Sequence, residues 1–222
     1  MSQAALRGLL PRASIGGVPR PLLLFAPGAG ASSHSPFMDR WAVHLSSIGE
    51  VTRFDYPYVV AGRSRPDRLP VLTAAHRAAL AAVRGRREGP VILVGKSMGA
   101  RVGCHLALEE PVAGLVCLGY PLRGRGGEIR CEVLLALRTP ILFVQGTRDP
   151  LCPLELLLDV QRRMVAPSAL HRVEGGDHGL AVRRGDLRGR GETPGDVERE
   201  ALGAIARFAG RLAGMPAPGR SP

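Results

Sequence analysis

Lysine is almost absent from this sequence. Lys96 is the only lysine among 30 basic residues, so nearly all of the positive charge comes from arginine, and the formal net charge is +11. A strongly basic chain can bind nucleic acid or an anionic membrane surface. The arginines are scattered, however, and the densest groups, at Arg84–Arg87 and Arg183–Arg190, lie in predicted loops or linkers. Because such partners require a clustered basic stripe, we predict neither a nucleic-acid partner nor a membrane partner.

Cysteine is also scarce. The four cysteines are Cys104, Cys117, Cys131 and Cys152, and they form no C-x-x-C pair and no two-Cys-two-His spacing of a zinc module. We interpret them as small apolar residues in a reducing compartment. The sequence predicts no bound metal and no cofactor.

Long apolar runs are missing as well. No segment approaches the ~20 apolar residues needed to span a bilayer, and prolines and glycines interrupt residues 1–20 too often for a signal peptide. We therefore expect a cytoplasmic protein. Residues 1–20 are predicted to be irregular, and the proline- and glycine-rich residues 215–222 to form a flexible tail.

The remaining residues, 21–214, are predicted to form one domain with an α/β fold. A chain of 222 residues suits a single domain with a full core. Short apolar runs closed by glycine or proline are typical of buried parallel strands, and such strands need helical crossovers. We predict strands at Pro21–Ala26, Val51–Tyr56, Val91–Val94, Ala113–Gly119, Ile141–Gln145 and Ala169–Glu174. Helices are predicted at Ser35–Ile48, Val71–Arg84, Ala100–Glu109, Cys131–Leu137, Pro153–Met164 and Asp196–Leu212. The result is a mostly parallel sheet of about six strands with helices on both faces.

The strongest functional signal is Gly95-Lys96-Ser97-Met98-Gly99. An apolar strand precedes this G-x-S-x-G pattern and a segment compatible with a helix follows it. In that setting, small flanking residues permit a sharp strand-to-helix turn that exposes the serine oxygen above the sheet edge. The identities of Lys96 and Met98 carry no information about the substrate. We predict that Ser97 is a nucleophile.

Two further residues complete a catalytic arrangement. Asp149 follows the predicted strand Ile141–Gln145, and His178 follows the last predicted strand. Reactive groups of parallel sheets collect at the carboxyl ends of strands, and the order Ser, Asp, His is that of the α/β-hydrolases. His178 would take the proton of Ser97, and Asp149 would orient the imidazole and stabilise its charged form.

An oxyanion hole is predicted beside the nucleophile. One donor would be the backbone N–H of Met98, the residue after the nucleophile. The other would come from the Gly28-Ala29-Gly30 turn after the first strand, where Ala29 is the favoured donor and Gly28 lies beside the substrate. Tyr120 follows another strand end and is expected to line the substrate pocket. Specificity is expected to depend on the loops Gly62–Leu69 and Tyr120–Arg130.

Other candidates have weaker positions. Asp177 competes with Asp149 as the acid, but its place next to His178 makes the geometry awkward. Asp55 is interpreted as a turn residue, and Arg123 and Arg125 as part of a solvated loop that could instead attract an anionic substrate. The remaining histidines are interpreted as structural: His34, His44, His76, His105 and His171.

Four blocks of the sequence resemble a known family: Gly95–Arg101, Gly119–Leu122, Phe143–Asp149 and Gly176–His178. They are similar to the compact dienelactone-hydrolase-like α/β hydrolases. Within these they are most similar to the branch with the testis-expressed hydrolase-like proteins and a scaffold subunit of a histone-acetyltransferase complex. The resemblance implies an α/β-hydrolase fold with few early strands and a minimal cap. The sequence departs from the family in having Pro27 where a histidine usually precedes the oxyanion turn, and in an insertion-like loop at Arg183–Arg190.

These observations favour one function and leave a second open. The first is a serine hydrolase that cleaves a small ester, thioester or lactone through an acyl-enzyme, acting as a monomer or homodimer. The alternative is a catalytically weak or inactive hydrolase fold that serves as a binding or scaffold protein. It rests on the relatives named above and on the surface arginines.

Overall fold

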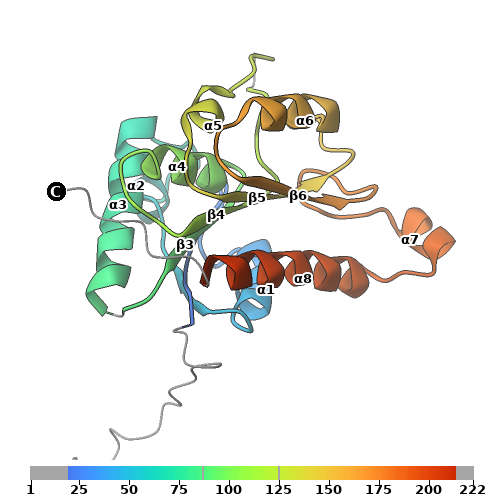
Figure 1. Cartoon of the computed structure of the whole chain (residues 1–222), viewed down its shortest axis with the longest axis horizontal. Coiled ribbons are helices and arrows are strands. Elements are labelled where there is room, and N and C mark those ends of the chain that lie inside the picture. The colour runs from blue at the N-terminus through green and yellow to red at the C-terminus, as the bar shows by residue number, and fades with distance from the viewer. Residues whose placement is uncertain (1–19, 87, 125, 214–222) are drawn as a thin grey trace, which may run out of the picture.

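Six parallel strands form a sheet at the centre of the protein (Figure 1). The computed structural model describes residues 20–86, 88–124 and 126–213. The strand order is β2-β1-β3-β4-β5-β6, and every neighbouring pair is parallel. The strands are β1 (Leu22–Ala26), β2 (Glu50–Arg53), β3 (Val91–Lys96), β4 (Gly114–Leu118), β5 (Ile141–Gly146) and β6 (Ser168–Val173). All six predicted strands are confirmed, with ends that differ by a few residues.

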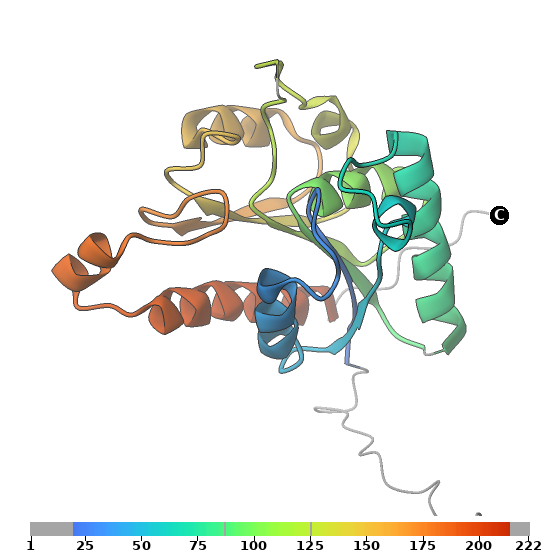
Figure 2. The ribbon, with the colours of Figure 1, turned by 180° about the vertical axis from the view of Figure 1, so that it is seen from behind.

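Helices cover both faces of the sheet. The helices are α1 (Pro36–Leu45), α2 (Pro57–Val60), α3 (Leu69–Arg86), α4 (Met98–Leu106), α5 (Glu132–Ala136), α6 (Leu154–Arg163), α7 (Arg184–Arg190) and α8 (Pro194–Ala213). Helices α1 and α8 lie on one face, and α3, α4, α5 and α6 lie on the other (Figures 1 and 2). This is the predicted α/β-hydrolase architecture, and each of the six predicted helices is present.

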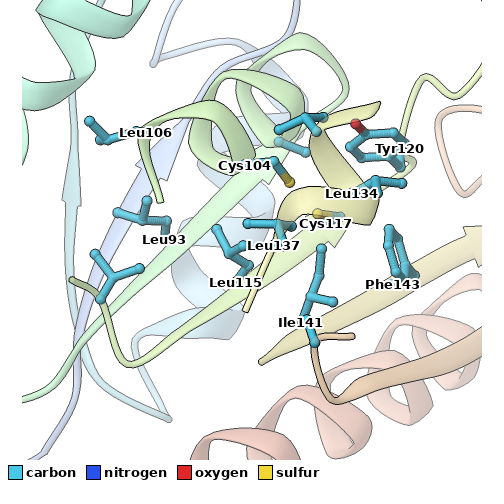
Figure 3. Close-up of a cluster of buried hydrophobic side chains, with 14 of the residues drawn as sticks. Leu93, Cys104, Leu106, Leu115, Cys117, Tyr120, Leu134, Leu137, Ile141 and Phe143 are labelled. Atoms are coloured by element: carbon cyan, nitrogen blue, oxygen red, sulfur yellow. The ribbon is translucent and has the colours of Figure 1, made fainter. Parts of the chain in front are cut away.

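The core is divided by the sheet. Successive strand residues point to opposite faces, so Leu22 and Leu24 join the cluster under α3 and α4, whereas Leu23 and Phe25 pack against α1 and α8. Because both faces are covered, the four inner strands β1, β3, β4 and β5 are largely apolar runs in the sequence. The edge strands β2 and β6 contain polar and charged residues. Figure 3 shows the first cluster around β4 and β5, where Cys104 and Cys117 lie among leucines. Cys104, Cys117 and Cys152 are free and buried, and Cys131 is free and partly buried.

One predicted loop and one predicted strand end differ from the structure. The Arg183–Arg190 segment is not a loop but the two-turn helix α7, because Leu187 is buried and Gly191 closes the helix at a φ of 67°. A left-handed conformation of this kind favours glycine and ends helices. The predicted strand Val51–Tyr56 ends at Arg53, because the unpredicted short helix α2 follows it, with Pro57 in its first turn.

The predicted ends of the chain are not described by the structure. Apart from Arg20, the irregular segment 1–20 and the tail 215–222 lie outside the described residues. Within the described ranges, no helix is long and apolar enough to cross a membrane.

Candidate active site

Ser97 occupies a sharp turn between β3 and α4. Its φ of 49° and ψ of −112° place it in a region that L-residues rarely adopt. Among the described residues, Ser97 and Leu180 are the non-glycine positions with positive φ. Backbone strain of this kind costs about 1–3 kcal/mol and persists where the surroundings impose it. The turn therefore has the geometry predicted for a nucleophile elbow.

The two glycines of the G-x-S-x-G pattern are sterically required. A Cβ atom at Gly95 would lie 2.2 Å from the backbone nitrogen of Ala100. At Gly99 it would lie 2.6 Å from the carbonyl oxygens of both Ala26 and Pro27. The elbow therefore packs directly against the end of β1, where the Gly28-Ala29-Gly30 turn begins.

Three side chains from three different loops meet at the carboxyl edge of the sheet. Ser97 Oγ lies 2.8 Å from His178 Nε2, and His178 Nδ1 lies 2.7 Å from Asp149 Oδ2. Ser97 follows β3, Asp149 follows β5, and His178 follows β6. The structure thus brings together the three residues that the sequence analysis singled out, in hydrogen-bond contact suited to proton transfer.

Asp149 is buried and fully hydrogen-bonded. Its Oδ2 accepts hydrogen bonds from His178 Nδ1 and from Gln145 Nε2 at 2.6 Å, and its Oδ1 accepts one from the Leu151 N–H at 2.8 Å. Burial by itself raises the pKa of this carboxyl group. The hydrogen bonds and the His178 charge outweigh burial, so the net pKa lies below its ordinary value. Asp149 therefore remains ionised at neutral pH.

Asp177 does not compete for His178. Its Oδ1 accepts hydrogen bonds from the N–H groups of Gly179 (2.7 Å) and Ala181 (3.0 Å), so this carboxylate shapes the loop that carries His178. Asp55 also has a local role, since its Oδ1 accepts a hydrogen bond from the Ser33 N–H at 2.5 Å.

The other histidines have structural surroundings. His76 is completely buried beside Tyr56 Oη at 3.3 Å, and burial lowers its pKa to about 3. His44 Nε2 lies 3.0 Å from Glu198 Oε2, and His34 Nδ1 lies 3.8 Å from Asp39 Oδ1. Burial lowers the pKa of His105 and of His171, which are both partly buried. Among the described residues, no group of three or more His, Cys, Asp or Glu side chains is arranged to hold a metal.

The turn after β1 leaves two backbone N–H groups without a hydrogen-bond partner among the described residues, those of Gly28 and Ala29. The Gly30 N–H donates to Tyr58 Oη at 3.0 Å, and the Ala31 N–H donates to the Gly28 carbonyl at 3.3 Å. A Cβ atom at Gly28 would lie 3.7 Å from Ser97 Cβ, so the turn is in direct contact with the elbow. This arrangement supports Ala29, together with the Met98 N–H at the start of α4, as the oxyanion donors.

Tyr120 does not lie where the sequence analysis placed it. Its side chain is 0% exposed and packs edge-to-face on Phe143 in the core (Figure 3). This burial contradicts the prediction that its side chain lines the substrate pocket. Its backbone N–H instead donates to Gln145 Oε1 at 2.9 Å. Tyr120 therefore holds the glutamine that in turn contacts Asp149.

Two residues near the site escaped the sequence analysis. Gln145 is a polar residue in a buried strand, and both ends of its amide are hydrogen-bonded, one of them to Asp149. Tyr58 lies on the unpredicted helix α2, and its hydroxyl also donates to the Gly28 carbonyl at 3.5 Å. For Gln145, the one available signal in the sequence was a polar residue within an otherwise apolar strand. No signal in the sequence connects Tyr58 with the Gly28–Ala31 turn.

Gly99→Ala is expected to damage the oxyanion hole. The new Cβ would push α4 away from the end of β1, because its close neighbours are backbone atoms that cannot rotate aside. Overpacking of this kind costs about 1–3 kcal/mol of folding stability. Displacement of one oxyanion donor lowers kcat by about 10²- to 10³-fold. Thermal melts and ester hydrolysis rates measure the two effects.

Gly210→Ala is the matched control. Gly210 lies exposed in α8, and a Cβ there meets nothing within 4 Å. Because alanine favours a helix over glycine, this variant is expected to gain about 0.5 kcal/mol and keep its activity. Equal behaviour of the two variants would contradict the packing at the elbow.

The sequence profile of the alpha/beta hydrolase domain family matches residues 19–209. The chain belongs to this family. Several solved structures share its fold. An alpha-beta serine hydrolase homologue from Coxiella burnetii is 19% identical, with a TM-score of 0.63, and the match covers 88% of this chain and 86% of that one. Est1E from Butyrivibrio proteoclasticus, with ferulic acid bound, is 15% identical, with a TM-score of 0.65, and the match covers 89% of this chain and 91% of that one. Dienelactone hydrolase from Anabaena variabilis is 21% identical, with a TM-score of 0.61, and the match covers 89% of this chain and 86% of that one. At these identities the likeness establishes the fold.

Proposed function

We propose that this alpha/beta hydrolase is a serine hydrolase that cleaves a small ester, thioester or lactone through an acyl-enzyme on Ser97. The observation that carries the proposal is the unbroken hydrogen-bonded series from Ser97 through His178 to Asp149. Its nucleophile stands on a strained turn, and its acid is ionised and buried. The dienelactone hydrolase among the similar structures, and the ferulic acid bound to Est1E, support the substrate class.

The geometry supports a two-step reaction. Ser97 Oγ attacks the carbonyl carbon of the substrate while His178 Nε2, 2.8 Å away, removes the hydroxyl proton. Asp149, 2.7 Å from Nδ1, stabilises the imidazolium that results. His178 then delivers the proton to the leaving oxygen or sulfur, and the acyl group remains on Ser97. A water molecule, deprotonated by the same imidazole, releases the acid and restores the serine.

The oxyanion would be held by backbone groups. The carbonyl oxygen of the tetrahedral intermediate would accept hydrogen bonds from the N–H groups of Met98 and Ala29. Each such donor contributes roughly 2.7–4 kcal/mol to transition-state stabilisation. Because Tyr58 ties down the peptide groups on both sides of Ala29, this donor is held in place before the substrate binds.

Covalent labelling by a fluorophosphonate probe tests the proposal. Such a probe reacts only with an activated serine, because the neutral hydroxyl of an ordinary serine is a weak nucleophile. The wild-type protein is expected to incorporate one probe, and peptide mass spectrometry is expected to find it on Ser97. His178→Ala is expected to label far more slowly, since it lacks the general base.

Two variants serve as controls. Ser97→Ala lacks the proposed nucleophile and therefore measures background labelling. Ser47→Ala removes an exposed hydroxyl that contacts only the His44 carbonyl, and it is expected to label like the wild type. A folded wild-type protein that takes up no probe, or takes it up equally in Ser97→Ala, would refute the proposed function.

A further inference from the structure

The only lysine of the chain lies inside the candidate active site. Lys96 ends β3 and directly precedes Ser97, and its Nζ donates a hydrogen bond to the backbone carbonyl of His178. The same ammonium lies 5.5 Å from the centre of the Phe37 ring on α1, a favourable cation–π distance. Lys96 therefore links the strand that carries the nucleophile to the loop that carries the base.

The space around Lys96 is shaped by two glycines. A Cβ atom at Gly119 would lie 2.8 Å from Lys96 Nζ, 2.6 Å from the His178 carbonyl oxygen and 3.6 Å from His178 Nδ1. A Cβ atom at Gly28 would lie 3.4 Å from Lys96 Cγ. The ammonium and the imidazole are thus near neighbours, and a side chain at position 119 would displace the lysine.

We propose that Lys96 is a positioning residue for His178: its ammonium fixes the His178 carbonyl and thereby holds the imidazole within hydrogen-bond reach of Ser97. This inference rests on the proposed function. The bond is charge-assisted, so it is stronger than a bond between neutral groups.

The choice of lysine at this position is informative, since every other side chain of this charge is arginine. A compact ammonium fits beside Gly119, whereas a planar guanidinium is wider and does not lose its proton. Burial lowers the pKa of Lys96 to about 8, and the charges of Asp149 and Asp177 offset only part of this effect. Among the described residues, the charges that act on Lys96 are those of Asp149 and Asp177. As the pH rises through about 8, Lys96 loses its charge and the bond to the His178 carbonyl weakens.

The pH dependence of fluorophosphonate labelling tests the role of Lys96. In Lys96→Met the labelling rate at pH 7 is expected to fall about 10-fold, because the charge-assisted bond to the loop is lost. The wild-type rate is expected to decline above pH 8, and this decline is expected to be absent in Lys96→Met.

Arg162→Met is the matched control, because it removes one exposed positive charge on α6. Its profile is expected to coincide with that of the wild type. Lys96→Gln, which keeps an N–H donor without the charge, replaces Lys96→Met if circular dichroism shows that the methionine variant does not fold. A folded Lys96 variant with the labelling rate at pH 7 and the alkaline limb of the wild type would overturn the inference.

A second measurement needs no catalysis. With lysine labelled at the ε carbon by ¹³C, the chain gives a single lysine signal, and its midpoint is expected near pH 8 in the Ser97→Ala protein. A lysine midpoint near the ordinary value of about 10.4 would also overturn the inference. A lysine midpoint near pH 8, together with a folded wild-type protein that takes up no probe, would refute the proposed function alone.

Discussion

Ser97→Ala is expected to lower kcat for ester hydrolysis by about 10⁶-fold, the loss that follows removal of a triad nucleophile in well-studied serine hydrolases. The remaining side chains have nothing to replace Ser97 Oγ, which lies 2.8 Å from His178 Nε2. KM is expected to change little, because the hydroxyl contributes to the transition state and not to ground-state binding. Release of p-nitrophenol from p-nitrophenyl acetate, followed at several substrate concentrations, measures both constants.

The strain at Ser97 gives this prediction a second, independent test. Alanine keeps the unfavourable backbone conformation, with φ at 49°, whereas glycine adopts it freely. Ser97→Gly is therefore expected to be about 1 kcal/mol more stable than Ser97→Ala, although both are inactive. Thermal melts of the two variants compare them directly. Hydrolysis by Ser97→Ala within 10-fold of the wild-type rate would show that another group is the nucleophile.

The sequence predicted the sheet well because the sheet is covered on both sides. Runs such as Leu22–Ala26 and Val91–Val94 are apolar throughout, as strands buried on both faces must be. Helix α7 was missed for the opposite reason. It has one buried residue, Leu187, among arginines and glycines, so no periodic apolar face exists for a sequence pattern to reveal.

The sequence could predict which candidate site residues lie close together where their positions depend on the backbone alone. The residues that follow parallel strands lie at one sheet edge, and this rule brought Ser97, Asp149 and His178 together. It does not give the direction of a side chain. Tyr120 also follows a strand, yet its ring turns into the core. Lys96 lies within the elbow motif, but its partner is a carbonyl more than eighty residues away, which no local pattern shows.

Asp149→Asn is expected to lower kcat by about 10⁴-fold, as seen when the triad aspartate of a serine protease is replaced by its amide. Three donors surround this carboxylate: His178 Nδ1 and Gln145 Nε2 at Oδ2, and the Leu151 N–H at Oδ1. An asparagine has one oxygen and one NH₂ group, so in either orientation the NH₂ group faces a donor. If it faces His178, the imidazole takes the wrong tautomer. If it faces Leu151, the tautomer is kept, but the charge that stabilises the imidazolium is gone.

The pH dependence of folding stability tests the same interactions of the Asp149 carboxylate. The pKa of Asp149 is lower in the folded protein than its ordinary value, because the hydrogen bonds and the His178 charge outweigh burial. The carboxylate therefore stabilises the fold fully above its unfolded pKa, and this contribution disappears as the pH falls through the folded pKa. Asp149→Asn is expected to melt below the wild type at pH 7, and the difference is expected to shrink as the pH falls below about 4. A difference in melting temperature that stays constant down to pH 2 would show that Asp149 is not held ionised by His178, Gln145 and Leu151, and the mechanism would lose its acid.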